Sequence, residues 1–414
     1  MKRSTLYFIV FSTIASALNY AIYPVLARIL STSGFVQITV SLALLTQMSS
    51  FTLSLVALTI GLSKNTEENP KILIEKLQTM LIHIFIVILL IFLLFSPILL
   101  SKLHIPLKML LPICIMLALS IPMSIITGYL NGLGRLTKLG LVILMSAVFQ
   151  FILTAVVGSV TSNGTAALNA MALGSFLAII TTYVLYKSEN LPHLNSFFRH
   201  GLSIYRSKNI RSLVKYTALA SLATLVVNIL LIFDLLVINY LHPNSKLYAD
   251  IYVISRIVFF SGMLFVWPFL SNVDTNNPRK NIRLFYKLSG VFIAISLVAM
   301  VAMTLFSQQV THYLLGSNYE STNELKTLAI LAVIYKFLYL MITALILYFI
   351  VLRSYWAAWL AAILIVATLV ALFITDRASN MSIVASLNVA ATVSLAFGMC
   401  GFFLVSNRDE VVDG

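Results

Sequence analysis

Apolar stretches long enough to cross a lipid bilayer recur along almost the whole of this 414-residue sequence. A spanning helix needs about 20 predominantly apolar residues, and lipid offers an open backbone no hydrogen-bond partners. Hydrophobic residues make up 60% of the chain and charged residues 10%, so lipid is the expected solvent for much of its surface. The sequence therefore predicts an all-α, polytopic membrane protein with about twelve transmembrane helices. The stretches lie at 5–29, 34–62, 78–101, 107–131, 138–161, 166–186, 214–240, 248–271, 284–307, 327–352, 354–375 and 382–405.

The longest predicted connection on the inner side divides these stretches into two sets of six. It runs from Lys187 to Lys215 and is polar and basic, with Pro192 within it. We therefore expect an N-terminal lobe over 1–200 and a C-terminal lobe over 201–414. An even number of helices in each lobe gives both lobes the same orientation, so any repeat between them is parallel.

The distribution of Lys and Arg predicts the orientation. Of the 27 such residues, two lie inside predicted spans and six lie at outer ends when the N-terminus is placed inside; the other nineteen lie at inner loops and ends. Such an excess is typical of cytoplasmic loops, so both termini are expected in the cytoplasm. The six outer residues are Arg28, Lys102, Lys108, Lys246, Lys326 and Arg377.

Three ionisable residues lie inside predicted spans, all in the C-terminal lobe: Asp234, Arg256 and Lys336. A charge at mid-membrane costs at least about 2.5–3.5 kcal/mol, so each needs a physical reason. At 1.5 Å per residue they lie roughly 9–14 Å from the outer end of their helices. Together with Arg28, at the outer end of the first helix, they form a set with more cations than anions. A cavity lined by this set would favour an anion such as a phosphate, because charge-assisted bonds are weakly screened there.

Each of these residues also has a purely structural interpretation. Asp234 and Arg256 are equally well explained as a pair that fixes two neighbouring helices. Arg28 is explained as an interfacial anchor. Lys336 has no acidic neighbour in its own helix and shares a face with Tyr339, which favours a cavity-facing position. Snorkelling, or a partner on another helix, would account for it as well.

Uncharged polar residues in the first span are further candidates for substrate binding. Asn19 and Tyr23 are four residues apart and share a helix face, where they would meet the hydroxyl groups of a sugar. The same residue types also join membrane helices by hydrogen bonds.

Several function classes lack their expected residues. The two cysteines, Cys114 and Cys400, lie in apolar runs, so neither a disulfide framework nor a metal site is indicated. No phosphate-binding glycine loop indicates ATP hydrolysis, and no cofactor is expected. The net charge of +14 comes mainly from short loops between apolar stretches, which argues against nucleic-acid binding. The acids within 1–210 are all at loops or helix ends, so a carboxylate relay in the N-terminal lobe is not expected.

Four segments resemble one transporter family. The segment at 234–260, "DLLVINYLHPNSKLYADIYVISRIVFF", resembles the seventh and eighth helices of Wzx-type polysaccharide flippases of the multidrug/oligosaccharidyl-lipid/polysaccharide (MOP) exporter superfamily. The segment "YLLGSNYES" at 313–321 resembles the external turn before that family's tenth helix, and "LARILSTSGF" at 26–35 resembles its first turn. "GYLNGLGRL" at 128–136 is similar to the end of its fourth helix. Lys246 and Leu247 depart from the family, which often has glycine in that turn.

This resemblance implies a MATE/MOP-like fold, with two six-helix lobes around a central cavity, in the bacterial inner membrane. It implies a flippase that carries a lipid-linked oligosaccharide outward for surface polysaccharide assembly, and not an enzyme. Membrane lipids, and other membrane proteins of polysaccharide assembly, are the candidate partners. Two alternatives stay open: a drug or small-molecule exporter of the same superfamily, and a membrane glycan polymerase. The short predicted external loops do not favour a polymerase.

Overall fold

The computed structural model contains helices throughout its described part and no strand there. It describes residues 3–31, 51–64, 74–79, 106–187, 208–241, 246–275, 279–315, 323–375 and 379–407, with residues 34, 37, 38, 41, 42, 45, 72, 82, 191, 192 and 277. The chain folds into two compact units, Met1–Ser221 and Leu222–Gly414. This division falls inside a helix, and the predicted lobe boundary at residue 200 stays a prediction.

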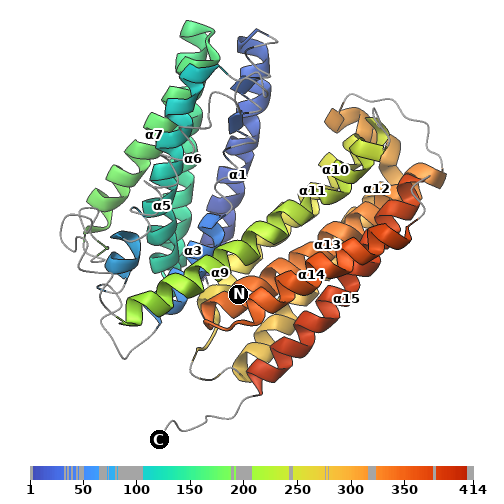
Figure 1. Ribbon diagram of the computed structural model, residues 1–414. Helices are drawn as coiled ribbons and strands as arrows, with labels where there is room; N and C mark the ends of the chain where they lie inside the picture. The colour runs from blue at the N-terminus through green and yellow to red at the C-terminus, as the bar shows by residue number, and fades with distance from the viewer. Residues whose placement is uncertain are drawn as a thin grey trace, which may run out of the picture. The chain divides into compact units, whose positions relative to one another are not determined.

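The described helices of the first unit lie within or close to the predicted apolar stretches. They are α1 (Arg3–Ile29), α3 (Phe51–Ser63), the short 3₁₀ helix η1 (Leu107–Met109), α5 (Leu110–Gly132), α6 (Leu136–Thr161) and α7 (Gly164–Leu185) (Figure 1). Pairs α1 and α6, and α6 and α7, pack along much of their lengths. The predicted span at 34–62 is described mainly at α3, and most of 78–101 lies outside the described residues.

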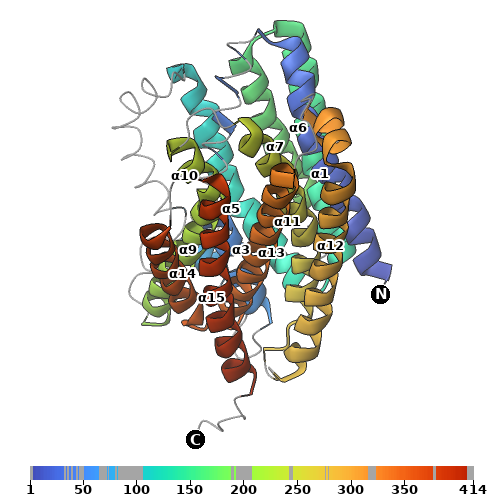
Figure 2. The same cartoon turned by 90° about the vertical axis from the view of Figure 1, so that its right-hand side faces the viewer.

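The second unit is built around one buried helix. Its helices are the end of α9 (Lys208–Leu231), then α10 (Phe233–Leu241), α11 (Lys246–Asn272), α12 (Arg279–Leu315), α13 (Asn323–Val351), α14 (Trp356–Ile374) and α15 (Asn380–Ser406) (Figures 1 and 2). Helix α13 packs against α11, α12, α14 and α15 and is buried along most of its length. It therefore forms the core of this unit.

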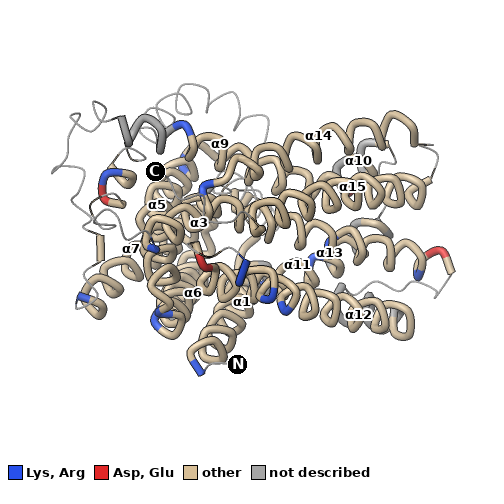
Figure 3. Tube along the Cα trace, turned by 90° about the horizontal axis from the view of Figure 1, so that it is seen from below, with Lys and Arg blue, Asp and Glu red and all other residues tan. Residues whose placement is uncertain are grey.

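The outer helices carry the surface expected in lipid. Phe373 and Ile374 of α14 are 87% and 76% exposed, and Val298 of α12 is 71% exposed. No charged residue occurs in α14 or α15 (Figure 3). Eight helices in the described part are long and apolar enough to cross a membrane, by length and composition. The chain is therefore a multi-pass membrane protein; the full set of twelve spans is not confirmed.

Two glycines allow α5 to approach α3 closely. A Cβ added at Gly128 would lie 2.7 Å from both the Thr59 Cβ and the Val56 carbonyl oxygen. One added at Gly132 would lie 2.6 Å from the Ser63 Cβ. Small residues at such interfaces let the backbones of membrane helices approach closely, and the resulting packing contacts stabilise the pair where lipid supplies no hydrophobic driving force.

Gly128→Ala is expected to destabilise the first unit by about 1–3 kcal/mol, because the backbone of α3 must move to admit the methyl group. The measurement is the apparent Tm of the purified protein in detergent. Gly290→Ala is the matched control, since nothing lies within 4 Å of its added Cβ. An equal Tm for both variants would contradict the close packing of α3 on α5.

A buried ion pair at an interrupted helix

The predicted span at 214–240 is interrupted in the structure. Helix α9 ends at Leu231 and α10 begins at Phe233, so the two are separated by Ile232. The Ile232 amide donates to the Ile229 carbonyl oxygen at 3.2 Å, which closes the last turn of α9 tightly. The last four carbonyl groups of a helix lack donors within that helix. The interruption therefore leaves backbone oxygens inside the second unit that need partners from elsewhere.

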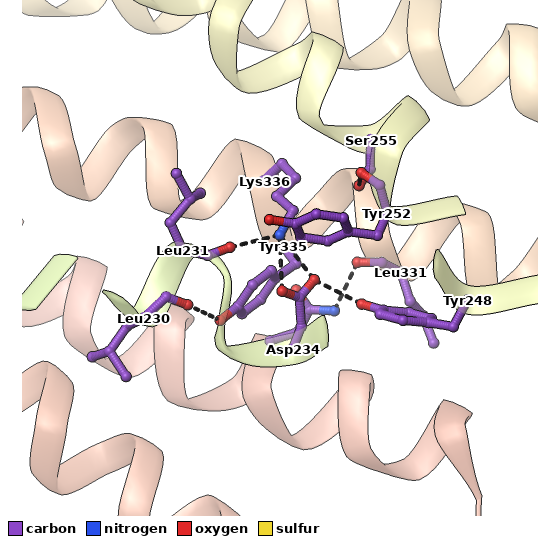
Figure 4. Close-up of polar contacts among 10 residues, drawn as sticks. Leu230, Leu231, Asp234, Tyr248, Tyr252, Ser255, Leu331, Tyr335 and Lys336 are labelled. Carbon is purple, nitrogen blue, oxygen red and sulfur yellow. Dashed lines mark hydrogen bonds and ion pairs between the residues drawn. The ribbon is translucent and has the colours of Figure 1, made fainter. Parts of the chain in front are cut away.

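Side chains of α13 supply these partners. The Tyr335 hydroxyl donates to the Leu230 carbonyl oxygen at 2.6 Å, and the Lys336 Nζ donates to the Leu231 carbonyl oxygen at 2.7 Å. Both side chains are fully buried. Consecutive residues of α13 thus hold the end of α9 (Figure 4).

The Lys336 ammonium also pairs with Asp234 in the first turn of α10. Its Nζ lies 3.0 Å from Oδ1 and 2.8 Å from Oδ2, and both side chains are 0% exposed. The Tyr248 hydroxyl of α11 donates to Asp234 Oδ2 at 2.7 Å. Three oxygens thus use all three donors of the ammonium, and the carboxylate is shared between a cation and a phenol (Figure 4).

Aromatic rings enclose the pair. Lys336 Nζ lies 4.4 Å from the ring centroid of Tyr252 and 4.7 Å from that of Tyr335. The rings of Tyr335 and Tyr339 are 4.6 Å apart, so Tyr339 adds a second buried ring on the same helix. Ring faces attract cations and keep water out, which strengthens the pair electrostatically.

Arg256 lies beside this cluster and has a different environment. Its guanidinium carbon is 5.5 Å from the centroid of Tyr252 and 5.0 Å from that of Phe260. Its Nε is buried and has no hydrogen-bond partner among the described residues. Lys336 and Arg256 thus both lie against Tyr252, but within the described part of the chain only Lys336 has a carboxylate partner. The cluster of Asp234, Lys336 and Arg256 carries one net positive charge.

The structure brings together the four candidate residues of the C-terminal lobe. Asp234 takes Lys336 as its ionic partner rather than Arg256, and Lys336 neither snorkels nor stands unpaired. The N-terminal candidates belong to the first unit, on α1, where Asn19 and Arg28 are exposed and the side chain of Tyr23 lies outside the described residues. No cluster of three metal-ligating side chains occurs in the described part of the chain.

Sequence reasoning missed three members of the cluster: Tyr248, Tyr252 and Tyr335. Tyr248 and Tyr252 are four residues apart, as are Tyr252 and Arg256, so spacing alone places them on one face of α11. Tyr335 directly precedes Lys336 in the chain. The sequence signal that could have identified these tyrosines is an aromatic residue beside an intramembrane charge, either adjacent in the chain or one helical turn away.

Comparison with solved structures gives the fold a known counterpart. The chain is similar to a multidrug resistance MATE family transporter of the MOP superfamily in an outward-facing conformation, with a TM-score of 0.76 at 13% identity over 98% of this chain and 97% of that one. It is also similar to a MATE transporter in the straight conformation (TM-score 0.73, 11% identity, 98% and 96% coverage). A third similar structure is a MOP superfamily transporter from Pyrococcus furiosus, for which a binding pocket of reverse polarity suggests a different function (TM-score 0.71, 12% identity, 98% and 96%).

These likenesses show the fold: an all-helical membrane protein with the architecture of MATE transporters of the MOP superfamily, matched over nearly its full length. No protein-family model and no curated protein sequence matches the chain.

Proposed function

We propose that this protein is a transporter of the MOP type that moves a lipid-linked oligosaccharide, bound through its phosphate or pyrophosphate, from the inner to the outer leaflet by alternating access. It serves surface polysaccharide assembly in the bacterial inner membrane, with both termini in the cytoplasm. The proposal rests on the fold and on the resemblance to Wzx-type flippases. The observation that carries it is that the partly buried Arg256 has no carboxylate partner among the described residues.

Arg256 supports an anionic headgroup because its guanidinium has no carboxylate partner among the described residues. Asp234 and Lys336 neutralise each other in a fully buried ion pair, so neither charge is available to a ligand unless the pair breaks. The Arg256 guanidinium contacts the rings of Tyr252 and Phe260, and its buried Nε has no hydrogen-bond acceptor among the described residues. A guanidinium in such surroundings suits phosphate oxygens, which accept two of its donors at once.

Reconstitution tests the proposal directly. Proteoliposomes containing the purified protein are loaded with a fluorescent polyprenyl-pyrophosphate oligosaccharide in the leaflet that corresponds to the cytoplasm. We expect the label to become accessible to a membrane-impermeant quencher faster than in protein-free vesicles. Equal rates in both preparations would contradict the proposed substrate.

Membrane potential is expected to drive this export. Moving one negative charge outward across an inside-negative membrane releases about 2.3 kcal/mol per 100 mV, so two charges release about 4.6 kcal/mol. That free energy corresponds to a distribution ratio of roughly 10³ between the leaflets. Collapsing the potential with potassium and valinomycin should therefore reduce outward accumulation of the label. A distribution that does not respond to the potential would show that charge does not move with the substrate alone.

Drug export is the second candidate function. It is favoured by the buried carboxylate of Asp234, because such a group would bind a cationic drug if it were released from Lys336, and by the multidrug transporter among the similar structures. Ionophore-sensitive efflux of a cationic dye that is lost in Asp234→Asn, with no movement of the labelled lipid, would favour this function over the flippase.

A further inference from the structure

The Lys336 ammonium is held as a small free cation is held. Its ligands are three oxygens within 2.7–3.0 Å: the Leu231 carbonyl oxygen and both carboxylate oxygens of Asp234. The group is 0% exposed, and no water is needed to complete its hydrogen bonds. The positive charge thus sits in a shell of oxygen atoms with two aromatic faces around it.

The two half-helices at the interruption shape this shell. The C-terminal end of α9 carries partial negative charge and points a carbonyl oxygen at the cation, while the N-terminal end of α10 favours the ionised form of Asp234. Interrupted membrane helices with freed carbonyl oxygens are used by transporters to coordinate monovalent cations. The geometry here is that of such a site, with an amine in place of the ion.

A spare acceptor lies on a neighbouring helix. Asn388 of α15 donates through Nδ2 to the Leu331 carbonyl oxygen at 3.0 Å, on the turn of α13 just before Tyr335. Its Oδ1 is buried and has no hydrogen-bond partner among the described residues. Helix α15 packs against both α13 and α10, the two helices that carry the ion pair. The second unit therefore holds, on a helix that packs against both partners of the ion pair, a buried oxygen that the lysine does not use.

We propose that the Leu231 carbonyl and the Asp234 carboxylate form a monovalent-cation site whose permanent occupant is the tethered amine of Lys336. A buried ion pair is costly to build, and apolar residues of similar volume would fill the same space equally well, so the pair needs a reason beyond packing. A tethered cation supplies one: it holds the two half-helices together without an exchangeable ion. The protein as it exists then requires no sodium or other alkali cation at this position.

Removing the amine should leave a site that an alkali cation can occupy. The probes are NaCl and LiCl, each compared with choline chloride at equal ionic strength, and the readout is the apparent Tm of the full-length protein in detergent. We expect Lys336→Ala to gain stability from Na⁺ or Li⁺, with a Tm that rises with the logarithm of salt concentration. The unaltered protein should show no difference among the three salts.

Two further variants make the result decisive. Lys336→Ser places a small hydroxyl group in the vacated space and serves where Lys336→Ala does not fold. The double variant Asp234→Ala/Lys336→Ala lacks the carboxylate and should lose the response to Na⁺ and Li⁺. The proposal is overturned if neither Lys336 variant responds to either cation, including failure of both to fold in every salt. It is also overturned if the double variant responds as strongly as the single ones, or if the unaltered protein is itself stabilised by Na⁺ or Li⁺ over choline.

This inference does not depend on the transported substrate. The Tm readout needs no transport assay, so its outcome and that of the lipid-movement assay are independent. Where movement of the labelled lipid is observed, its rate should be the same in NaCl and in choline chloride. A rate that requires Na⁺ would contradict the tethered cation.

Discussion

Replacing Asp234 by alanine is expected to lower the free energy of unfolding of the second unit by about 3–5 kcal/mol. The variant leaves the Lys336 ammonium in a fully buried position with one carbonyl oxygen and two ring faces as its remaining partners. It also leaves the Tyr248 hydroxyl without its acceptor. The measurement is unfolding of the purified protein in detergent, followed by helical circular dichroism and by Tm.

The double variant Asp234→Leu/Lys336→Met is the control for this prediction. Apolar side chains of similar volume replace a buried ion pair at little or no cost, so the double variant should be more stable than Asp234→Ala. The coupling free energy from the cycle of Asp234→Leu, Lys336→Met and their double variant measures the pair itself. A coupling near zero would contradict the geometry of the Asp234–Lys336 pair.

Replacing Arg256 by alanine is expected to lower the rate of lipid-linked oligosaccharide movement by roughly 10- to 100-fold. A hydrogen bond to a charged group contributes about 1.5–3 kcal/mol, and this variant removes such a bond to the headgroup phosphate. The fold should tolerate the change, because Arg256 has no ionic partner among the described residues that would be left behind. The rate is measured by the quencher assay, together with the Tm of the variant.

Two variants control the Arg256 prediction. Arg256→Lys keeps the charge but loses the paired donors, so an intermediate rate is expected. Arg283→Ala removes one positive charge from an exposed position of α12 and should move lipid at the unaltered rate. An Arg256→Ala protein that is stable and moves the labelled lipid normally would refute the role of Arg256 in headgroup binding.

Hydropathy predicted the helices well because it is a local property. The stretches at 107–131, 138–161 and 166–186 coincide with α5, α6 and α7 to within a few residues, and those at 248–271 and from 327 onward coincide similarly with α11 and α13 to α15. Helix α12 is longer than its predicted stretch at 284–307 and has non-helical backbone at Phe306. The interruption at Ile232 was not predicted, since it contains no proline or glycine and the apolar run continues through it. The interruption is stabilised by hydrogen bonds from Tyr335 and Lys336 of α13, and these contacts depend on tertiary packing.

The charged residues of the candidate site were predicted from the sequence, but the pairing of Asp234 with Lys336 was not. An intramembrane charge is visible in a sequence, so Asp234, Arg256 and Lys336 were identifiable one by one. Which cation meets the carboxylate depends on helix packing, and Lys336 is 102 residues from Asp234 along the chain. Arg256, closer in sequence, lies against Tyr252 and Phe260 instead. Asp234 therefore neutralises Lys336, whereas Arg256 has no carboxylate partner among the described residues.

The dependence of transport on headgroup charge tests the central claim most directly. Three labelled lipids carry the same oligosaccharide on the same polyprenyl chain through a pyrophosphate, a phosphate or an uncharged ether linkage. The unaltered protein should move the pyrophosphate and phosphate lipids much faster than the ether lipid, and Arg256→Ala should move all three at similarly low rates. Equal rates for the charged and uncharged lipids in the unaltered protein would contradict recognition of an anionic headgroup.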